Sequence, residues 1–155
     1  MSGHFDDRFL RDYCLTSDAA RLSVDVIHRW LSTEAYWAHG RSRDAVAASI
    51  ENSHLYGVVT PEGETIACTR VITDHVTFGW ICDVFVEADY RGQGVGSWMV
   101  GEVVDYWTNV GVRRVLLATR DAHDVYATVG FVPLAVPDRF MEIDRRPKFS
   151  GAPEV

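Results

Sequence analysis

The stretch Val84-Phe85-Val86-Glu87-Ala88-Asp89-Tyr90-Arg91-Gly92-Gln93-Gly94-Val95-Gly96-Ser97-Trp98-Met99 decides the fold of this chain. It reads as the end of a buried strand, a polar bend, a glycine-rich turn and the start of an amphipathic helix. The first N–H groups of a helix have no partner within the helix, and the helix dipole favours negative charge there. Arg91 adds a cation suited to a phosphate oxygen. The stretch therefore predicts a cradle for a pyrophosphate group.

Length and composition indicate one globular domain. The chain has 155 residues, 47% of them hydrophobic, and a formal net charge of -7. No apolar run approaches the roughly 18 residues that span a bilayer, and the polar N-terminus does not resemble a signal peptide. Three cysteines without metal-ligand spacing favour free thiols and a cytoplasmic location. The acidic balance argues against nucleic-acid binding and leans towards a cationic substrate. We therefore expect no metal, no nucleic acid and no membrane among the partners.

The order of predicted elements is that of a mixed α/β domain. Residues 9–16 read as an edge strand, followed by helices from Asp18 and from Ser42. Strands are predicted at 55–60, 65–73 and 76–86, then the glycine turn and its helix, which ends near Gly111. Residues 112–119 read as a buried central strand, 121–129 as a short helix, and 131–134 with 139–143 as a closing strand pair. Residues 1–8 are expected to be disordered, 9–144 to form the domain, and 145–155 to be a mobile tail.

The spacing of the glycines distinguishes between three kinds of phosphate cradle. No lysine follows them, which excludes the P-loop pattern Gly-x-x-x-x-Gly-Lys-Ser/Thr. The dinucleotide fingerprint Gly-x-Gly-x-x-Gly fits poorly, because Ser97 stands where its third glycine belongs and the parent strand is the fourth of the chain. The pattern that remains is Arg91-x-x-Gly94-x-Gly96 after an aliphatic-aromatic-aliphatic strand end.

With this pattern the chain resembles the GNAT superfamily of acyl-CoA-dependent N-acetyltransferases. Arg91-Gly92-Gln93-Gly94-Val95-Gly96 matches that family's Arg/Gln-x-x-Gly-x-Gly/Ala motif. Tyr126-Ala127-Thr128-Val129-Gly130-Phe131 is similar to its Tyr-x-x-x-Gly-Phe at the last helix–strand junction. The resemblance implies a single GNAT-like domain: an antiparallel meander, then a β-α-β-α-β half with a splayed central parallel strand pair. It also implies acetyl-CoA as acyl donor and allows a homodimer.

The resemblance assigns the donor-binding residues. The backbone of Val84, Phe85 and Val86 would face the pantetheine arm, and a backbone amide there, most simply that of Val84, would polarise the thioester carbonyl. The pyrophosphate would lie against the turn itself, which comprises Arg91, Gly92, Gln93, Gly94, Val95, Gly96 and Ser97. His123, one helical turn before Tyr126, is either a CoA contact or a solvated histidine.

The resemblance also assigns the chemistry. Tyr126 matches the tyrosine that protonates the departing thiolate, and it is included among the CoA contacts. A phenol of pKa about 10 can hydrogen-bond to a thiolate of pKa about 8.5 and donate as the C–S bond breaks. Asp83, a carboxylate in an apolar run, is a candidate base or amine binder; the alternatives are an ion pair with a neighbour such as Arg70, or deprotonation through water. Alternation along the strand places Ile81, Asp83 and Phe85 on one face.

The sequence says less about the residues that would bind the acceptor amine. The loop Glu34-Ala35-Tyr36-Trp37-Ala38-His39-Gly40-Arg41 lies where this fold covers its acceptor groove. Glu34 would pair with an ammonium group, Tyr36 and Trp37 would clamp a ring or alkyl chain, and Trp80 would line the same groove or fill the core. We expect direct transfer of an acetyl group to a primary amine of a small molecule in a ternary complex. A protein or peptide N-acetyltransferase, an acyl-CoA sensor without turnover, and a nucleotide-binding regulatory domain are the alternatives.

Overall fold

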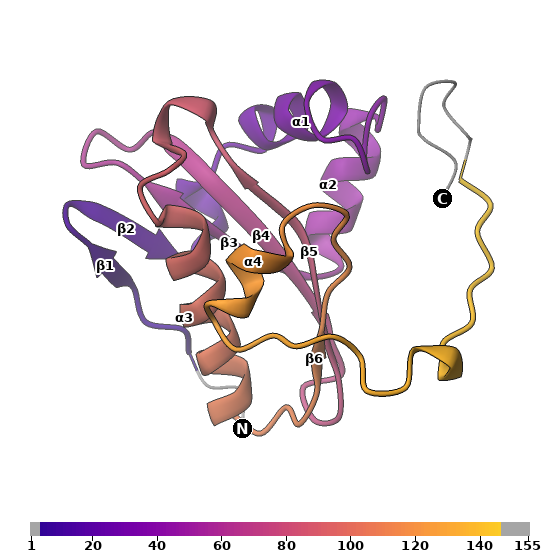
Figure 1. The fold of residues 1–155 in the computed structure, drawn as a ribbon. Coiled ribbons are helices and arrows are strands. Elements are labelled where there is room, and N and C mark those ends of the chain that lie inside the picture. Colours follow the sequence, from indigo (N-terminus) through magenta and orange to yellow (C-terminus); the bar gives the residue numbers. More distant parts are fainter. Residues whose placement is uncertain (1–3, 147–155) are drawn as a thin grey trace.

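The computed structural model describes residues 4–146 and forms one mixed sheet flanked by helices (Figure 1). Six strands lie side by side in the order β1-β2-β3-β4-β5-β6. All neighbouring pairs are antiparallel except β5 and β6, which are parallel. The strands are β1 (Arg8–Leu10), β2 (Tyr13–Thr16), β3 (His54–Val59), β4 (Thr65–Thr73), β5 (Gly79–Val86) and β6 (Val115–Leu116). The helices are η1 (Ala19–Arg21), α1 (Val24–Thr33), α2 (Arg43–Glu51), η2 (Ala88–Tyr90), α3 (Val95–Asn109), α4 (His123–Ala127) and η3 (Pro137–Arg139).

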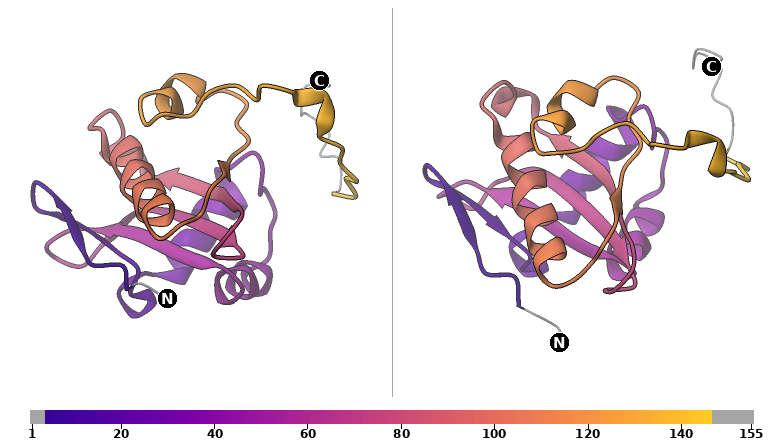
Figure 2. Two further views of the ribbon diagram at one scale, coloured as in Figure 1. Left: turned by 90° about the horizontal axis from the view of Figure 1, so that it is seen from below. Right: turned by 60° about the horizontal axis from the view of Figure 1, so that its bottom comes forward.

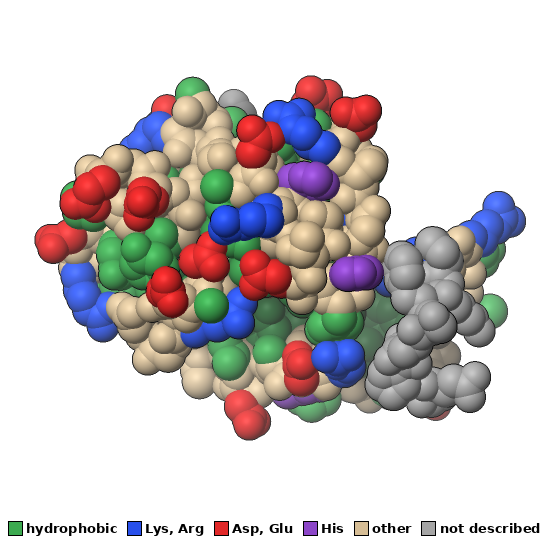
Figure 3. Space-filling view, turned by 90° about the horizontal axis from the view of Figure 1, so that it is seen from above, with side chains coloured by type: hydrophobic (Ala, Val, Ile, Leu, Met, Phe, Trp, Pro, Cys, Tyr) green, Lys and Arg blue, Asp and Glu red, His purple; other side chains and the backbone are tan. Residues whose placement is uncertain are grey.

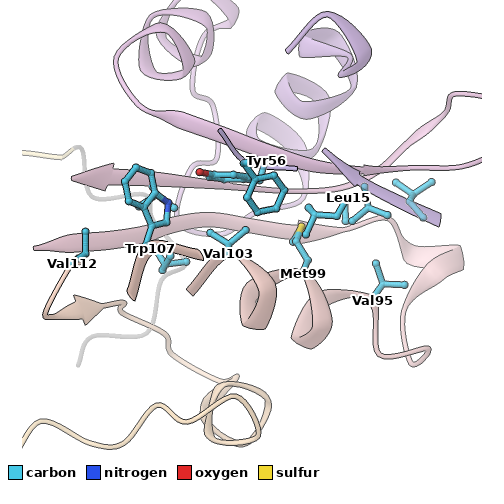
Figure 4. Packing of buried hydrophobic residues seen from close by; sticks show 13 residues of the cluster. Leu15, Tyr56, Val95, Met99, Val103, Trp107 and Val112 are labelled. Carbon is cyan, nitrogen blue, oxygen red and sulfur yellow. The ribbon is translucent and has the colours of Figure 1, made fainter. Parts of the chain in front are cut away.

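The helices cover both faces of the sheet. The views in Figures 1 and 2 place α3 and α4 on one face and α1 with α2 on the other. On the α3 face, Val95, Met99, Val103 and Trp107 form a buried stripe that packs on sheet residues such as Leu15 and Tyr56 (Figure 4). On the opposite face, Trp30, Leu31 and Val46 belong to a second buried cluster. The expected single α/β domain is therefore found.

The first two long helices begin at side-chain caps. The hydroxyl of Ser23 accepts a hydrogen bond from the Val26 amide, and that of Ser42 accepts one from the Ala45 amide. The expected start at Ser42 is confirmed. The first helix was expected from Asp18, but Asp18 caps the short turn η1 instead, and α1 begins only at Val24.

The N-terminal segment differs from the expectation. Residues 4–8 were assigned to a disordered end, yet Phe5 is buried and packs edge-on against Tyr56 and Tyr106. The expected single strand over 9–16 is a hairpin, because Arg11 adopts a left-handed turn conformation with φ of 54°. Residues 1–3 of the expected disordered end lie outside the described residues.

The parallel pair β5 and β6 separates soon after it begins. Only Gly79–Val115 and Trp80–Leu116 are paired, at the first residues of both strands. Beyond Trp80 no residue of β5 pairs with the chain that follows β6 within residues 4–146. The expected splayed parallel pair is confirmed, but β6 is the last strand of the sheet and not a central one, and it is far shorter than the strand predicted over 112–119.

A bulge in β5 changes which face its residues occupy. Arg70 pairs with Cys82 and Cys68 pairs with Phe85, so one residue of β4 lies opposite two of β5 at Asp83, whose φ is 51°. Ile81 consequently belongs to the cluster on the α3 face, whereas Phe85 belongs to the cluster on the α1 face. The expectation that Ile81 and Phe85 share a face is wrong, because the extra residue inverts the alternation.

The C-terminal segment does not close the sheet. The predicted strand pair at 131–134 and 139–143 is wrong: apart from η3, these residues carry no regular structure. The segment runs away from the domain instead of returning to it (Figures 1 and 2). The tail from residue 147 lies outside the described part of the chain. No helix among the described residues is long and apolar enough to cross a membrane.

Candidate functional site

The glycine turn positions a set of free backbone amides at the start of α3. Gly92 and Gly94 adopt φ of 74° and 79°, a left-handed conformation that side chains rarely accept. Gly94 is the N-cap, and the first helical bond runs from the Trp98 amide to the Gly94 carbonyl at 3.0 Å. The amides of Val95, Gly96 and Ser97 precede that bond and have no partner within the helix. This is the arrangement that binds a phosphate group.

Close packing explains the third glycine of the motif. A Cβ atom on Gly96 would lie 3.1 Å from Cγ2 of Val86 at the end of β5. Gly96 therefore lets the helix start approach the strand end, which places the amides beside the opening between β5 and β6. The Ser97 hydroxyl donates to the Gly94 carbonyl at 3.2 Å, so it stabilises the helix start rather than pointing freely outward.

Two arginines flank the turn, and the sequence identified only one of them. Arg91 donates from Nε to the Val86 carbonyl at 2.8 Å, and its guanidinium lies 5.1 Å from the centre of the Phe85 ring. The other is Arg11, from the β1–β2 hairpin, whose Nη2 lies 3.4 Å from the Gln93 carbonyl. Since 82 positions separate Arg11 from Gln93, no sequence motif could have found it.

The edge of β5 that faces the opening offers two amides. The Glu87 amide donates to the Ile66 carbonyl on β4 at 2.9 Å. Because N–H groups alternate along a strand, the amide of Phe85 also faces β4, whereas those of Val84 and Val86 face the opening towards β6. The Val84 amide, which is predicted to contact the thioester carbonyl, thus faces the opening, and the contact itself stays a prediction. The side chains of Val84 and Val86 pack against the α3 core.

Tyr126 is half-buried on α4, and burial raises its pKa to about 12, with Tyr36 and Asp121 contributing in the same direction. Its phenol therefore stays protonated at neutral pH and can donate a hydrogen bond. The Tyr126 carbonyl accepts a hydrogen bond from the Phe131 amide at 3.1 Å. The first and last residues of the Tyr-x-x-x-Gly-Phe motif are therefore bonded to each other across the C-terminal end of α4. His123, the first residue of α4, is exposed.

The α1–α2 loop reaches across to the segment that carries Tyr126. The Tyr36 hydroxyl accepts from the Arg120 amide at 3.2 Å, and the Arg120 guanidinium lies 3.7 Å from the centre of the Tyr36 ring. Tyr36 also packs edge-on against Trp37 at 5.0 Å. The loop thus places an aromatic pair beside the opening, with Tyr36 on the side of α4.

Asp83 is buried and held by three donors. Its Oδ1 accepts from Trp37 Nε1 at 3.1 Å, and its Oδ2 accepts from Arg41 Nη1 and Arg70 Nε, each at 2.8 Å. Its side chain is only 3% exposed. The ion pair with Arg70, foreseen as an alternative, is present. Asp83 therefore connects the α1–α2 loop to the sheet, while its action as a base remains a prediction.

An acidic cleft borders the same end of β5. It encloses about 820 Å³ between α1, the β3–β4 turn and η2, and its charged lining comprises Glu34, Glu64, Glu87, Asp89, Arg21 and Arg29. Figure 3 looks onto this end of the molecule, where acidic and basic side chains are interspersed. Oε2 of Glu34 lies 3.9 Å from Nη2 of Arg91. Oε2 of Glu87 accepts hydrogen bonds from Trp30 Nε1 and Arg29 Nη2, each at 2.7 Å. The hydrogen bond from Trp30 is the largest cause that lowers the pKa of Glu87.

The structure brings most of the predicted residues to one region. The glycine turn, the Val84–Val86 edge, Glu34, Tyr36, Trp37 and Asp83 surround the open end of the β5–β6 pair. Trp80 lies apart from them, at the last paired position of β5, where the two strands separate. Among residues 4–146, no group of three or more His, Cys, Asp or Glu side chains could hold a metal ion.

Comparisons with known proteins agree with this geometry. The sequence profile of the acetyltransferase (GNAT) family matches residues 24–131. The Gibberella zeae protein FG08082, a proposed acetyltransferase, is 31% identical over 131 residues, which cover 71% of this chain and 73% of that protein. A crystal structure of a GNAT-family protein from Xanthomonas campestris has 33% identity and a TM-score of 0.79, covering 92% of this chain and 95% of that one. Rv2747 from Mycobacterium tuberculosis, solved with CoA and NLQ, shares the fold at 18% identity and a TM-score of 0.63, over 76% of this chain and 70% of that one.

Proposed function

The chain belongs to the acetyltransferase (GNAT) family, and on that premise we propose that it transfers an acetyl group from acetyl-CoA to a primary amine of a small molecule by direct attack in a ternary complex. The observation that carries the proposal is the early separation of β5 from β6 with the glycine turn at its open end. The opening offers unpaired amides along β5, and the turn offers unpaired amides at the start of α3.

The residues present fit acetyl-CoA, which supplies an acyl group activated as a thioester. The amides of Val95, Gly96 and Ser97 would hold the pyrophosphate, with Arg11 and Arg91 beside them. Within residues 4–146, no neighbouring atom lies within 4 Å of an ideal Cβ position on Gly92 or Gly94, so both glycines border open space. The Val84 amide would donate to the thioester carbonyl and stabilise the negative charge that develops there.

Tyr126 serves the leaving group. With its pKa raised to about 12, the phenol stays protonated, so it can donate a hydrogen bond to the sulfur as negative charge develops there and the C–S bond breaks. Because a thiol of pKa about 8.5 is the stronger acid, we assign Tyr126 the role of hydrogen-bond donor in place of the full acid that the resemblance implies. We assign Asp83 a positional role, because three donors occupy its two oxygens. Water then accepts the proton that the ammonium group must lose before the neutral amine attacks the thioester carbonyl.

The acidic cleft supports a cationic acceptor of modest size. Glu34 and Glu87 form part of its wall, and Glu87 directly follows the last residue of β5, so the cleft begins where that strand ends. A volume of about 820 Å³ lies within the range of small-molecule sites, about 300–1,000 Å³. Both features favour a small amine over a folded protein surface.

The test has two stages. Calorimetry with acetyl-CoA should show saturable binding that ATP and NAD do not compete away. A panel of primary amines, including peptide N-termini and lysine peptides, is then assayed by release of the CoA thiol. Turnover with small diamines or amino sugars supports the proposal, and turnover with peptides alone identifies a peptide acetyltransferase. Binding without thiol release across the panel would indicate a sensor, and absence of acetyl-CoA binding would refute the proposal.

A further inference from the structure

The α1–α2 loop and the sheet bring two arginines to a single buried carboxylate. Oδ2 of Asp83 accepts hydrogen bonds from Arg41 Nη1 and Arg70 Nε, each at 2.8 Å. Burial raises the pKa of the neighbouring Cys82 thiol to about 11, and the charges that also act on this thiol are those of Arg70, Asp83 and Arg41. No second carboxylate of residues 4–146 is among them. Two guanidinium groups and one carboxylate therefore leave a surplus of one positive charge here.

The two arginines differ in how fully they are bonded. The side chain of Arg70 is 9% exposed, and its Nη1 also donates to the Ser49 carbonyl and the Ser53 hydroxyl, at 3.2 and 2.9 Å. The side chain of Arg41 is 28% exposed, and within residues 4–146 only its Nη1 donates to another group. Its Nε and Nη2 form an edge of the guanidinium that can hold both oxygens of a carboxylate. Arg41 thus carries the surplus charge and can reach a ligand.

Arg41 lies on the side of the sheet opposite to the expected donor. The glycine turn begins α3, so a donor held there lies on the α3 face (Figure 1). Trp37, which also donates to Asp83, packs against the cluster on the α1 face. Asp83 directly precedes Val84, whose amide is expected to receive the thioester carbonyl. An amine that attacks from the face opposite the donor therefore arrives beside Arg41.

The loop carries opposite charges at its two ends. Glu34, at its start, lines the acidic cleft, whereas Arg41, near its end, carries the surplus positive charge. A small molecule that has both an ammonium group and an anionic group is complementary to these two ends. A carboxylate would balance the surplus of one charge, whereas a phosphate monoester, with about −1.5 to −2 charges at pH 7, would exceed it. The charges therefore favour a carboxylate.

We propose that the acceptor is an amino acid, whose carboxylate binds the guanidinium of Arg41 while its amine attacks the thioester. This inference rests on the proposed transfer to a small amine and specifies the class of that amine. The ammonium group first gives one proton to water. Its nitrogen then bonds to the acyl carbon, the bond from that carbon to sulfur breaks, and a second proton of the nitrogen ends on sulfur. The products are an N-acetyl amino acid and the CoA thiol, and Arg41 determines specificity without taking part in the bond changes.

Matched acceptors test the proposal through release of the CoA thiol. L-alanine, L-phenylalanine, L-histidine and L-lysine are compared with ethylamine, phenethylamine, histamine and cadaverine, the same molecules without the carboxylate, and with O-phosphoethanolamine. At least one amino acid should exceed its counterpart in kcat/KM by about tenfold or more, the effect of a hydrogen bond between charged groups. Turnover of the amines without this preference, or fastest turnover of the phosphate compound, would overturn the proposal.

Arg41→Gln separates recognition of the acceptor from support of the loop. Glutamine keeps a donor for Asp83 but has no charge, so kcat/KM for the preferred amino acid should fall by about tenfold or more, and that for its counterpart by less than about twofold. Arg43→Gln is the matched control, because Arg43 is an exposed partner of Asp25 on α2, and it should change neither value. If both acceptors lose the same factor, Arg41 only supports the loop and the proposal is wrong.

A third measurement uses the wild-type protein and needs no turnover. Calorimetry on the enzyme with bound CoA compares the N-acetyl derivatives of the four amino acids with those of their counterparts. At least one N-acetyl amino acid should bind about tenfold more tightly than its counterpart, and added salt should reduce the difference. Equal binding in all four pairs would overturn the assignment of Arg41. Absence of thiol release from every amine would instead contradict the proposed function, and the binding comparison would still decide whether this site holds a carboxylate.

Discussion

The Nε of Arg70 lies 2.8 Å from Oδ2 of Asp83, and the two side chains are 9% and 3% exposed, so this ion pair joins β4 to β5 beside the bulge. Arg41, from the α1–α2 loop, shares the same carboxylate oxygen at 2.8 Å. The buried carboxylate thus fixes the loop that carries Tyr36 and Trp37 over the open end of the sheet.

Asp83→Asn should destabilise the fold, because Arg70 would remain buried without a counter-charge. We expect the free energy of unfolding in urea to fall by about 3 kcal/mol. Asp25→Asn, which removes an exposed partner of Arg43, should cost less than about 1 kcal/mol. If Asp83 only positions the loop, turnover should fall by the same factor at every pH. A loss that is largest at low pH would instead reveal a base.

Tyr126→Phe should reduce kcat by about 100-fold and change the dissociation constant of CoA far less, because the hydroxyl acts mainly on the leaving group. Tyr13→Phe, on a strand remote from α4, is the control and should be neutral. Since the pKa of Tyr126 is raised to about 12, its ionisation should produce no alkaline decline of kcat below about pH 10. Stopped-flow detection of the free thiol measures kcat and its pH dependence, and calorimetry measures the dissociation constant of CoA. Equal kcat for the two variants would remove the assigned role.

Gly94→Ala should weaken acetyl-CoA binding, because a left-handed alanine at the N-cap shifts the amides that hold the pyrophosphate. The chain offers a matched control in Gly63 of the β3–β4 turn, which has φ of 89° against 79° at Gly94 and equally open surroundings. Both variants should lose about 1 kcal/mol of stability. Only Gly94→Ala should raise the dissociation constant, by about tenfold, corresponding to about 1.4 kcal/mol. Calorimetry and thermal unfolding separate the two effects.

Arg11→Gln should weaken acetyl-CoA binding by up to about fivefold, the effect of an exposed charge contact of up to about 1 kcal/mol. The difference from wild type should shrink as salt is raised, because exposed charges are screened. Arg43→Gln, on α2 and paired with Asp25, should bind as wild type does. An Arg11 variant with unchanged affinity at low salt would show that Arg11 stabilises only the turn, through the Gln93 carbonyl.

His54→Gln should reduce the decrease in the free energy of unfolding that occurs as the pH is lowered. Burial, followed by the charge of His75, lowers the pKa of His54 below 6.5 in the folded state; the two Nε2 atoms are 3.0 Å apart. Between the folded pKa and 6.5 the unfolded chain binds more protons, so stability falls as pH falls through that window. Urea unfolding at pH 7.5 and 5.5 should show a smaller decrease for His54→Gln than for wild type. His28→Gln, on α1, serves as the control.

The sequence by itself determined the features that depend on neighbouring residues. The glycine turn, the cap at Ser42, the bounds of β4 and the Tyr126–Phe131 closure were all predictable, because φ preferences, capping and short-range hydrogen bonds act within a few positions. Two motifs of this kind also sufficed to identify the family. That identification also implied the splayed parallel pair without any knowledge of contacts.

Only the tertiary structure decided which distant residues meet. It placed Arg11 at the Gln93 carbonyl and added Arg41 and Trp37 to Arg70 as partners of Asp83. It also put Ile81 and Phe85 on opposite faces of the sheet and left residues 131–143 outside the sheet. Each of these outcomes depends on register. A single extra residue in β5 inverts every side chain beyond it, and a strand pattern does not specify its partner. The register of β5 and the choice of strand partners both depend on how much apolar surface the assembled sheet buries, and no local stretch of the chain determines that quantity.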